Sequence, residues 1–190
     1  RVVKNINAYL LAGTNTIVSK SSKPLTDLSE MSFGNKPVDG GNLLLSRAEV
    51  EALNLSRGQH AKFIRRIYGS AEFIQGKERY CLWIENENLA EALNIFSMKT
   101  RVEAVRKMRL SSKDKSANAM ATSAHQFREM EIGQSHALVV GGVSSETRDY
   151  FPVGLLDNKS TVTNLAFALF DAPLWNMAII ASKLHLTWIA

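Results

Sequence analysis

Apolar residues recur at helical spacing, or follow helix-capping signals, in five stretches of the chain. The clearest of them has its apolar positions at Met98, Val102, Val105 and Met108. Another begins at a capping box formed by Ser46 and Glu49. The predicted helices are Arg47–Asn54, Gly58–Tyr68, Asn88–Phe96, the stretch from Met98 to the Ser111-Ser112 pair, and a last helix opened by Pro173.

Short apolar runs bounded by Gly, Asn or other polar turn residues predict β-strands. These runs are Asn5–Leu11, Thr16–Lys20, Asn42–Leu45, Arg79–Ile84, His136–Val143, Tyr150–Leu156 and Val162–Phe170. Because helices and strands are intermixed without strict β-α-β alternation, the α+β class is favoured.

Two polar stretches interrupt this pattern. Met31–Leu45 holds Gly34, Asn35, Pro37, Asp39, Gly40 and Gly41, so it predicts a shaped loop. Gly40-Gly41 fits either a tight turn into the following strand or a backbone that approaches a ligand closely, and the pattern alone favours the turn. Lys115–Ser123 is small and polar, and we expect it to be the least ordered stretch.

Charge adds one feature that periodicity does not show. The segment Lys99–Lys115 carries seven Lys or Arg and two acids, a local net charge of +5 that equals the net charge of the whole chain. Such a concentration indicates either a surface that binds a polyanion or an ordinary solvated helix face. We expect four of its cations to face away from the apolar stripe or to flank it: Arg101, Arg106, Lys107 and Arg109.

Composition narrows the class of protein. A length of 190 residues with 45% hydrophobic and 22% charged residues is typical of a folded protein with one core or two small ones. No apolar run reaches the ~20 residues of a membrane span, no signal segment is evident, and the ends read like those of a piece of a longer chain. The calculated pI of 9.4 favours nucleic acid as the partner, and the single Cys81 reads as a buried hydrophobe in a cytoplasmic protein.

Motifs for catalysis are missing from the sequence. The four His residues show no metal-ligand spacing, and no Walker or G-x-S-x-G motif occurs. A methyltransferase would need a glycine-rich cofactor loop and, for amino methylation, a motif such as Asn-Pro-Pro-Tyr, and neither is present. We therefore expect no enzymatic activity from this chain alone.

Several long blocks, in order along the chain, resemble one family. They are Ile6–Leu11 (INAYLL), Ser22–Leu25 (SKPL), Met31–Ser46 (MSFGNKPVDGGNLLLS), Ala61–Ile84, Arg101–Lys113 (RVEAVRKMRLSSK), Val143–Asp157 (VSSETRDYFPVGLLD) and Ser182–Ile189 (SKLHLTWI). With these blocks the chain resembles the target recognition domain of MmeI-type DNA methyltransferases, bacterial restriction–modification enzymes that methylate adenine N6.

The resemblance implies that residues 1–190 form one α+β DNA target recognition domain. Its parent would be an adenine-specific DNA methyltransferase with the catalytic domain upstream and a helical region downstream. It further implies S-adenosylmethionine as the parent's cofactor and none for this chain. The implied partners are double-stranded DNA and the parent's methyltransferase domain, in the bacterial cytoplasm and on the nucleoid when bound. Whether the parent has a nuclease domain stays open.

On this view the basic segment contacts phosphates, which position a reader without specifying sequence. The residues assigned to it are Arg101, Arg106, Lys107, Arg109, Lys113 and Lys115. If ~4 of them engage phosphates, the logarithmic salt slope of binding is about −3.6. Arg109 and Lys113, near the end of the helix, also have the chemistry to reach guanine O6 and N7.

Two loops compete for the reading of bases. In the Ser144–Asp149 turn, Glu146 can accept from cytosine N4 and Arg148 can donate to guanine, so the pair would read one C·G base pair, while Ser144 and Ser145 hold phosphate. The alternative for this turn is a salt bridge within the protein or a solvated turn.

The second loop is Gly34–Asn42. Its Asn35, Asp39, Gly40 and Gly41 either touch DNA or dock on the methyltransferase domain. For the whole chain, the alternative function is a structural domain that packs on its own methyltransferase and whose basic charge is incidental.

Overall fold

The structure is a computed structural model that describes residues 4–8, 10–15, 17, 19, 21, 23–24, 29–145 and 147–189. The chain divides into two units, residues 1–30 and residues 31–190, which are described separately. In the first unit, a bridge between Ile6 and Ala12 closes a short loop, inside which the amide of Asn7 donates to the carbonyl of Leu11 (2.9 Å). The predicted strand Asn5–Leu11 is therefore wrong. The predicted strand Thr16–Lys20 lies outside the described residues at three of its five positions.

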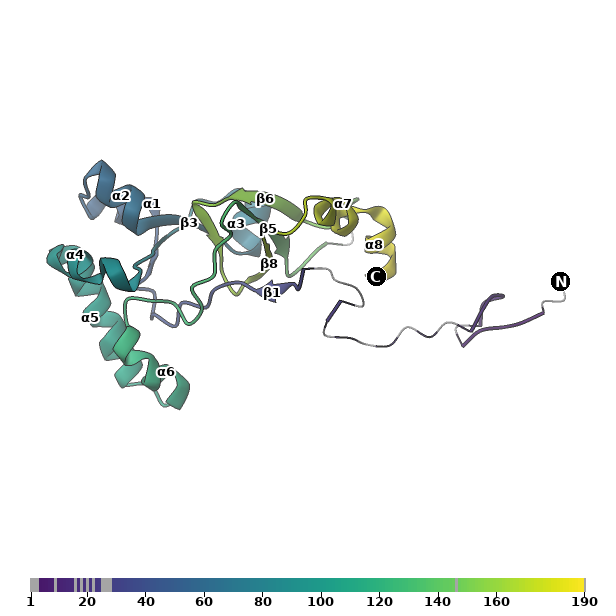
Figure 1. Ribbon diagram of the computed structural model, residues 1–190, viewed down its shortest axis with the longest axis horizontal. Helices are drawn as coiled ribbons and strands as arrows, with labels where there is room; N and C mark the ends of the chain where they lie inside the picture. The colour runs from purple at the N-terminus through teal and green to yellow at the C-terminus, as the bar shows by residue number, and fades with distance from the viewer. Residues whose placement is uncertain are drawn as a thin grey trace. The chain divides into compact units, whose positions relative to one another are not determined.

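The second unit contains short helices and two four-stranded sheets (Figure 1). Its helices are α1 (Arg47–Ala52), α2 (Arg57–Phe63), α3 (Ser70–Gln75), α4 (Leu89–Asn94), α5 (Phe96–Leu110), α6 (Lys115–Ala119), α7 (Trp175–Ala181), α8 (Lys183–Ile189) and the 3₁₀ helices η1 (Asn86–Asn88) and η2 (Met120–Ser123). Its strands are β1 (Ser32–Phe33), β2 (Leu44–Leu45), β3 (Ile64–Tyr68), β4 (Tyr80–Leu82), β5 (His136–Gly141), β6 (Val153–Asp157), β7 (Ser160–Val162) and β8 (Ala166–Phe170). The α+β class predicted from the sequence is confirmed.

The first sheet has the strand order β1-β8-β5-β6, and all of its neighbours are antiparallel. Its central strand β5 is buried on both faces. Leu138 and Val140 pack in a cluster with Ile180 of α7, whereas Val139 packs on the other side, in a cluster that includes Phe73 of α3. Period-2 alternation thus sends neighbouring side chains of β5 into two different apolar layers.

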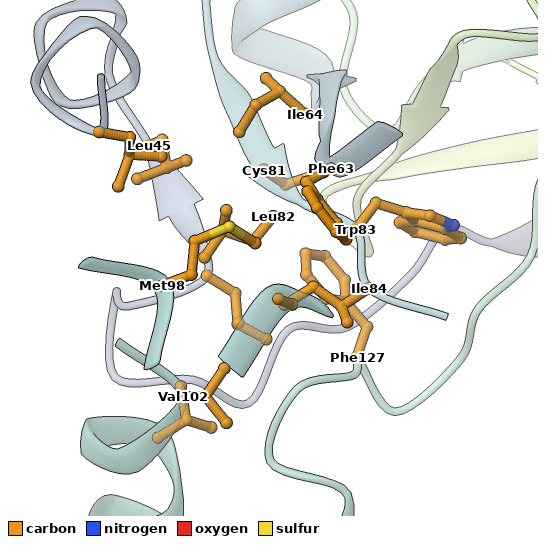
Figure 2. Close-up of a cluster of buried hydrophobic side chains, with 14 of the residues drawn as sticks. Leu45, Phe63, Ile64, Cys81, Leu82, Trp83, Ile84, Met98, Val102 and Phe127 are labelled. Atoms are coloured by element: carbon orange, nitrogen blue, oxygen red, sulfur yellow. The ribbon is translucent and has the colours of Figure 1, made fainter. Parts of the chain in front are cut away.

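The second sheet has the order β2-β4-β3-β7, with β3 and β7 parallel. It packs against α1, α2, α4 and α5 through the largest apolar cluster of the chain, in which Leu82, Ile84 and Met98 are fully buried (Figure 2). Cys81 belongs to the same cluster, and burial raises the pKa of its thiol to about 12. The prediction that Cys81 is a buried hydrophobe is confirmed.

Three predicted elements differ in the structure because tertiary pairing overrides local preference. The predicted helix Gly58–Tyr68 ends at Phe63, since Ile64–Tyr68 is needed as the strand between β4 and β7. The predicted strand Val162–Phe170 contains the last residue of β7 and the whole of β8. Between them the Thr163 hydroxyl accepts the amide of Leu165 (3.0 Å). The last helix is also two, α7 and α8, with Ser182 extended between them.

Local signals predicted other elements well. The Ser46 capping box is present, with the Glu49 amide donating to Ser46 Oγ (3.3 Å) and the Ser46 amide donating to Glu49 Oε2 (2.8 Å). Within the described ranges, no helix is long and apolar enough to cross a bilayer.

Candidate nucleic-acid interface

Helix α5 is held on the core by one apolar stripe. Met98, Val102 and Val105 are 0 to 3% exposed, as their spacing predicts. Five cations of the segment are exposed, and Lys99 is one of them. The other four are Arg106, Lys107, Lys113 and Lys115. None of these four forms an ion pair with another residue in the part of the chain that the structure describes.

The side chain of Arg109 is 0% exposed, so it points into the protein. The prediction that it faces away from the apolar stripe or flanks it is wrong. All five guanidinium N–H groups donate to backbone carbonyls. Nε donates to Val38 (2.8 Å), Nη1 to Met120 and Ser123 (both 2.9 Å), and Nη2 to Pro37 (3.0 Å) and Gln126 (2.7 Å). Five donors are the full capacity of a guanidinium, so none is left for guanine. Burial lowers the pKa of Arg109, while nearby Asp39 opposes the shift.

A sequence signal for this orientation was available. Arg109 continues the spacing of Met98, Val102 and Val105, four residues after the last of them, so it occupies the buried stripe itself. Its carbonyl partners in 120–126 also explain why the stretch predicted to be least ordered instead forms α6 and η2. That prediction was wrong because polar composition does not reveal a buried cation that tethers the backbone.

Two more cations of the basic segment are engaged within the protein. Arg101 Nη2 pairs with Glu49 Oε1 (2.8 Å), and Arg101 Nη1 donates to the carbonyl of Asn42 (3.1 Å). Lys99 lies 3.9 Å from Glu103, one helical turn away. Among the described residues, the exposed cations of the segment that lack an ion-pair partner are therefore Arg106, Lys107, Lys113 and Lys115.

The Gly34–Asn42 loop is stabilised by its own polar side chains. Asn35 is 1% exposed, and its amide side chain donates to the Glu131 carbonyl (2.8 Å) and accepts the Glu131 amide (2.7 Å). Asp39 is 5% exposed and accepts the amides of Gly41 (3.0 Å) and Leu43 (2.6 Å). The carboxamide of Asn35 and the carboxylate of Asp39 therefore hold the loop in shape and do not face solvent.

Glycine in this loop has a geometric reason. Gly40 and Gly41 have φ of +59° and +84°, in the left-handed region that L side chains rarely adopt. They are exposed, and the amide of Gly41 is already bonded to Asp39. The tight-turn interpretation accounts for both glycines.

The Ser144–Asp149 turn lies between the end of β5 and the start of β6. Gly141, the last residue of β5, donates its amide to the carbonyl of Pro152, the residue before β6 (2.8 Å). Ser145 shapes it by accepting the amides of Thr147 at its hydroxyl (3.3 Å) and of Arg148 at its carbonyl (3.0 Å). Ser144, Ser145 and Arg148 are exposed, whereas Glu146 lies outside the described residues. Arg148 has no ion-pair partner among the residues that the structure describes.

A second cationic region was missed by the sequence reasoning. Arg65 and Arg66 of β3 and Lys159 of the β6–β7 turn line one groove of about 560 Å³. Placing Arg65 and Arg66 on a helix hid this grouping, because only the strand pairing brings β3 beside β7. No group of three His, Cys, Asp or Glu side chains suited to a metal ion occurs in the described ranges.

Comparison with known proteins identifies the family. The family model described as "MmeI, target recognition domain" matches residues 12–190. The chain belongs to this family. The fold agrees, because the Type IIL restriction-modification enzyme MmeI, solved in complex with DNA, superposes with a TM-score of 0.80 and 29% identity over 96% of this chain. The resemblance stated from the sequence is confirmed.

A curated relative of this MmeI-family domain is DNA methyltransferase A of Bacillus subtilis (strain 168), 34% identical over 190 residues. The chain spans 22% of the length of that methyltransferase and 24% of the MmeI chain. It thus corresponds to about a quarter of each relative.

Proposed function

We propose that this MmeI-family domain reads the sequence of double-stranded DNA for a bacterial restriction–modification adenine N6 methyltransferase. It would place the target adenine before the catalytic domain of a longer parent chain, which binds S-adenosylmethionine. The observation that carries the proposal is the family match across residues 12–190, together with the fold shared with a DNA-bound enzyme. The place of action is the bacterial cytoplasm, on the nucleoid when bound.

Phosphate contact is assigned to the exposed cations of the α5 segment. Arg106, Lys107, Lys113 and Lys115 have no competing carboxylate among the described residues, so each is available to a phosphate at low cost. Four such contacts correspond to a logarithmic salt slope of about −3.6. Arg109 and Arg101 support this surface from inside through their carbonyl and carboxylate partners.

Base reading is assigned to the Ser144–Asp149 turn. Arg148 is exposed, and the chemistry of Glu146 and Arg148 matches cytosine N4 and guanine O6/N7 respectively. Ser144 and Ser145 offer hydroxyl groups to phosphate. Since adenine must leave the stacked duplex to be methylated, the domain would clamp DNA while the catalytic domain extrudes the base.

The side chains of the Gly34–Asn42 loop receive a different role. Asn35 and Asp39 are buried and bonded to backbone, so we assign Asn35 to the support of β7 and Asp39 to the support of β2. Gly40 and Gly41 form the turn that leads into β2. Direct DNA contact by these four residues is not needed to explain why they are there.

The second candidate is a domain that mainly packs on its own methyltransferase. Exposed apolar side chains on α7 and α8 favour it, since Trp175, Leu184 and Trp188 are 48%, 82% and 69% exposed. The two functions are compatible, because the apolar helices and the Ser144–Asp149 turn use different residues.

Methylome sequencing of cells that carry the full-length parent tests the assignment. We expect the charge-exchange variant E146R/R148E to change or abolish methylation at one position of the recognised motif. Lys77→Glu, on the exposed turn after α3, is the matched control and should leave the motif intact. An unchanged motif in E146R/R148E would remove the Ser144–Asp149 turn from base reading.

A further inference from the structure

The groove between α2, β3 and the β6–β7 turn has the features of a binding site. It is lined by other residues than Arg106, Lys107, Lys113 and Lys115, which together are called the α5 surface. Its volume is about 560 Å³. It is lined by His60 and Ala61 of α2, by Arg65 and Arg66 of β3, and by Lys159 and its neighbours in the β6–β7 turn. Register explains the meeting of these elements, because Arg66 pairs with Ser160 at the start of β7.

Positive charge dominates this groove. Arg65, Arg66 and Lys159 are basic side chains, and Asp157 is the one carboxylate among the described residues that line the groove. Asp157 Oδ1 is occupied by the Lys159 amide (3.2 Å) and the Ser160 hydroxyl (2.7 Å), which shape the turn. None of the three cations is ion-paired with another described residue, in contrast to Arg101 beside Glu49.

The two guanidinium groups are held in place but keep unused donors. Arg65 lies over the ring of Trp83 (5.5 Å) and Arg66 over that of Tyr68 (5.1 Å), so each is oriented by an aromatic face. Arg65 Nη1 donates to the Asn158 carbonyl (2.8 Å). The Nε atoms of Arg65 and Arg66 are buried and have no hydrogen-bond partner. A phosphate oxygen cannot reach these buried atoms either. Within the described residues, the hydrogen bond recorded for the two guanidinium groups is that of Arg65 Nη1, so their other Nη–H groups are left for a ligand's acceptor oxygens.

We propose that this groove binds a phosphate of the DNA backbone, as a second contact beyond the α5 surface. Phosphate fits because Arg and Lys recognise it through charge-assisted hydrogen bonds, and a guanidinium can do so with two N–H groups. The inference rests on the proposed function, which supplies DNA as the source of phosphate.

Position along the sheet separates this contact from base reading. The groove borders the end of β6 where Asp157 pairs with His136, and the Ser144–Asp149 turn leaves the other end of the same two strands. Five strand residues between them correspond to about 17 Å. For a duplex that lies along these two strands, that length is about five base pairs, and the groove would then contact DNA flanking the bases that are read.

The test uses the full-length parent and measures the salt dependence of its binding to cognate and non-cognate duplexes. Because the groove holds one phosphate, we expect K159Q and R65Q/R66Q each to lower the absolute salt slope by up to about 0.9, equally for both duplexes. The methylated motif should stay the same. K77Q, on an exposed turn outside the groove, is the control and should leave the slope unchanged. Because Lys159 is exposed, K159Q keeps the test valid if R65Q/R66Q folds poorly.

Three results would overturn the inference while leaving the proposed function standing. The first is an unchanged slope in K159Q when R106Q/K107Q lowers it, which would limit phosphate contact to the α5 surface. The second is an unchanged slope accompanied by lost methyltransferase activity, which would assign the groove to an acidic surface of the parent. Titration with inorganic phosphate distinguishes binding of a free anion from binding of DNA. The third overturning result is that the wild type binds phosphate saturably and K159Q does not, while the salt slope of DNA binding is the same in both. Absence of duplex binding by the wild-type parent would instead defeat the proposed function itself.

Discussion

Helix α5 and strand β3 both carry adjacent or near-adjacent basic residues, but the fold uses them in opposite ways. In α5 the charge is conspicuous along the chain, yet Arg109 points into the core and Arg101 is paired with Glu49. In β3 the charge is modest, yet Arg65 and Arg66 line a groove without carboxylate partners among the described residues. Local charge density therefore indicates the ligand class, whereas partner groups decide which cations are available to it.

The largest expected effect comes from removing the available charge of the basic segment, in α5 and in the residues that follow it. The variant R106Q/K107Q/K113Q/K115Q of the full-length parent should bind duplex DNA on the order of 10³-fold more weakly at 0.1 M salt, with a salt slope reduced by about 3.6. Its thermal stability should match the wild type because all four side chains are exposed. Fluorescence anisotropy across a salt series measures the slope. Wild-type binding at every salt concentration would show that these residues are only a solvated face.

Arg109 should give the opposite pattern, a loss of stability. R109M removes five hydrogen bonds and leaves buried carbonyls without donors, so we expect a loss of about 4 kcal/mol in unfolding free energy. R109K should restore part of it, because an ammonium group has three donors and no planar fork. Urea denaturation measures the effect, with R106M as the exposed control on the same helix. Equal stability of R109M and R106M would contradict the assigned role of Arg109.

A smaller effect concerns Arg101 and its partner. The bond from the Ser46 amide, followed by that from Arg101, lowers the pKa of Glu49 to about 2 from its ordinary value of 4.5. A lowered folded-state pKa means that this stabilisation is complete above pH 4.5 and is lost as the pH falls toward 2. Since the pair is partly exposed, its size should be below about 1 kcal/mol.

Denaturation at a series of pH values measures that loss. We expect R101Q to flatten the pH dependence between 4.5 and 2 relative to the wild type. K99Q serves as the control because Lys99 pairs with Glu103 instead. Identical profiles for R101Q and wild type would assign the lowered pKa of Glu49 to the Ser46 cap alone.

Much of the fold was accessible from local patterns. The Ser46 capping box, the buried stripe of α5 and the strands β4, β5 and β6 all follow from interactions between near neighbours in the chain. The strand β3 did not, because Ile64–Tyr68 continues a helical pattern and becomes a strand only through pairing with β4 and β7. Asn35 and Asp39 likewise read as exposed loop residues until their backbone partners are seen.

The family and the α+β class could be predicted from the amino-acid sequence, because long blocks keep their order along the chain, and the net charge indicated a polyanion as the proposed ligand. Which cations are available to that ligand depends on the tertiary structure. Arg109 depends on carbonyls of Pro37 and Gln126, which are 72 and 17 residues away. Arg66 gains its groove from a turn that follows it by more than ninety residues. A side chain's exposure is set by the segments that fold around it, and those contacts are not encoded within its own helix or strand.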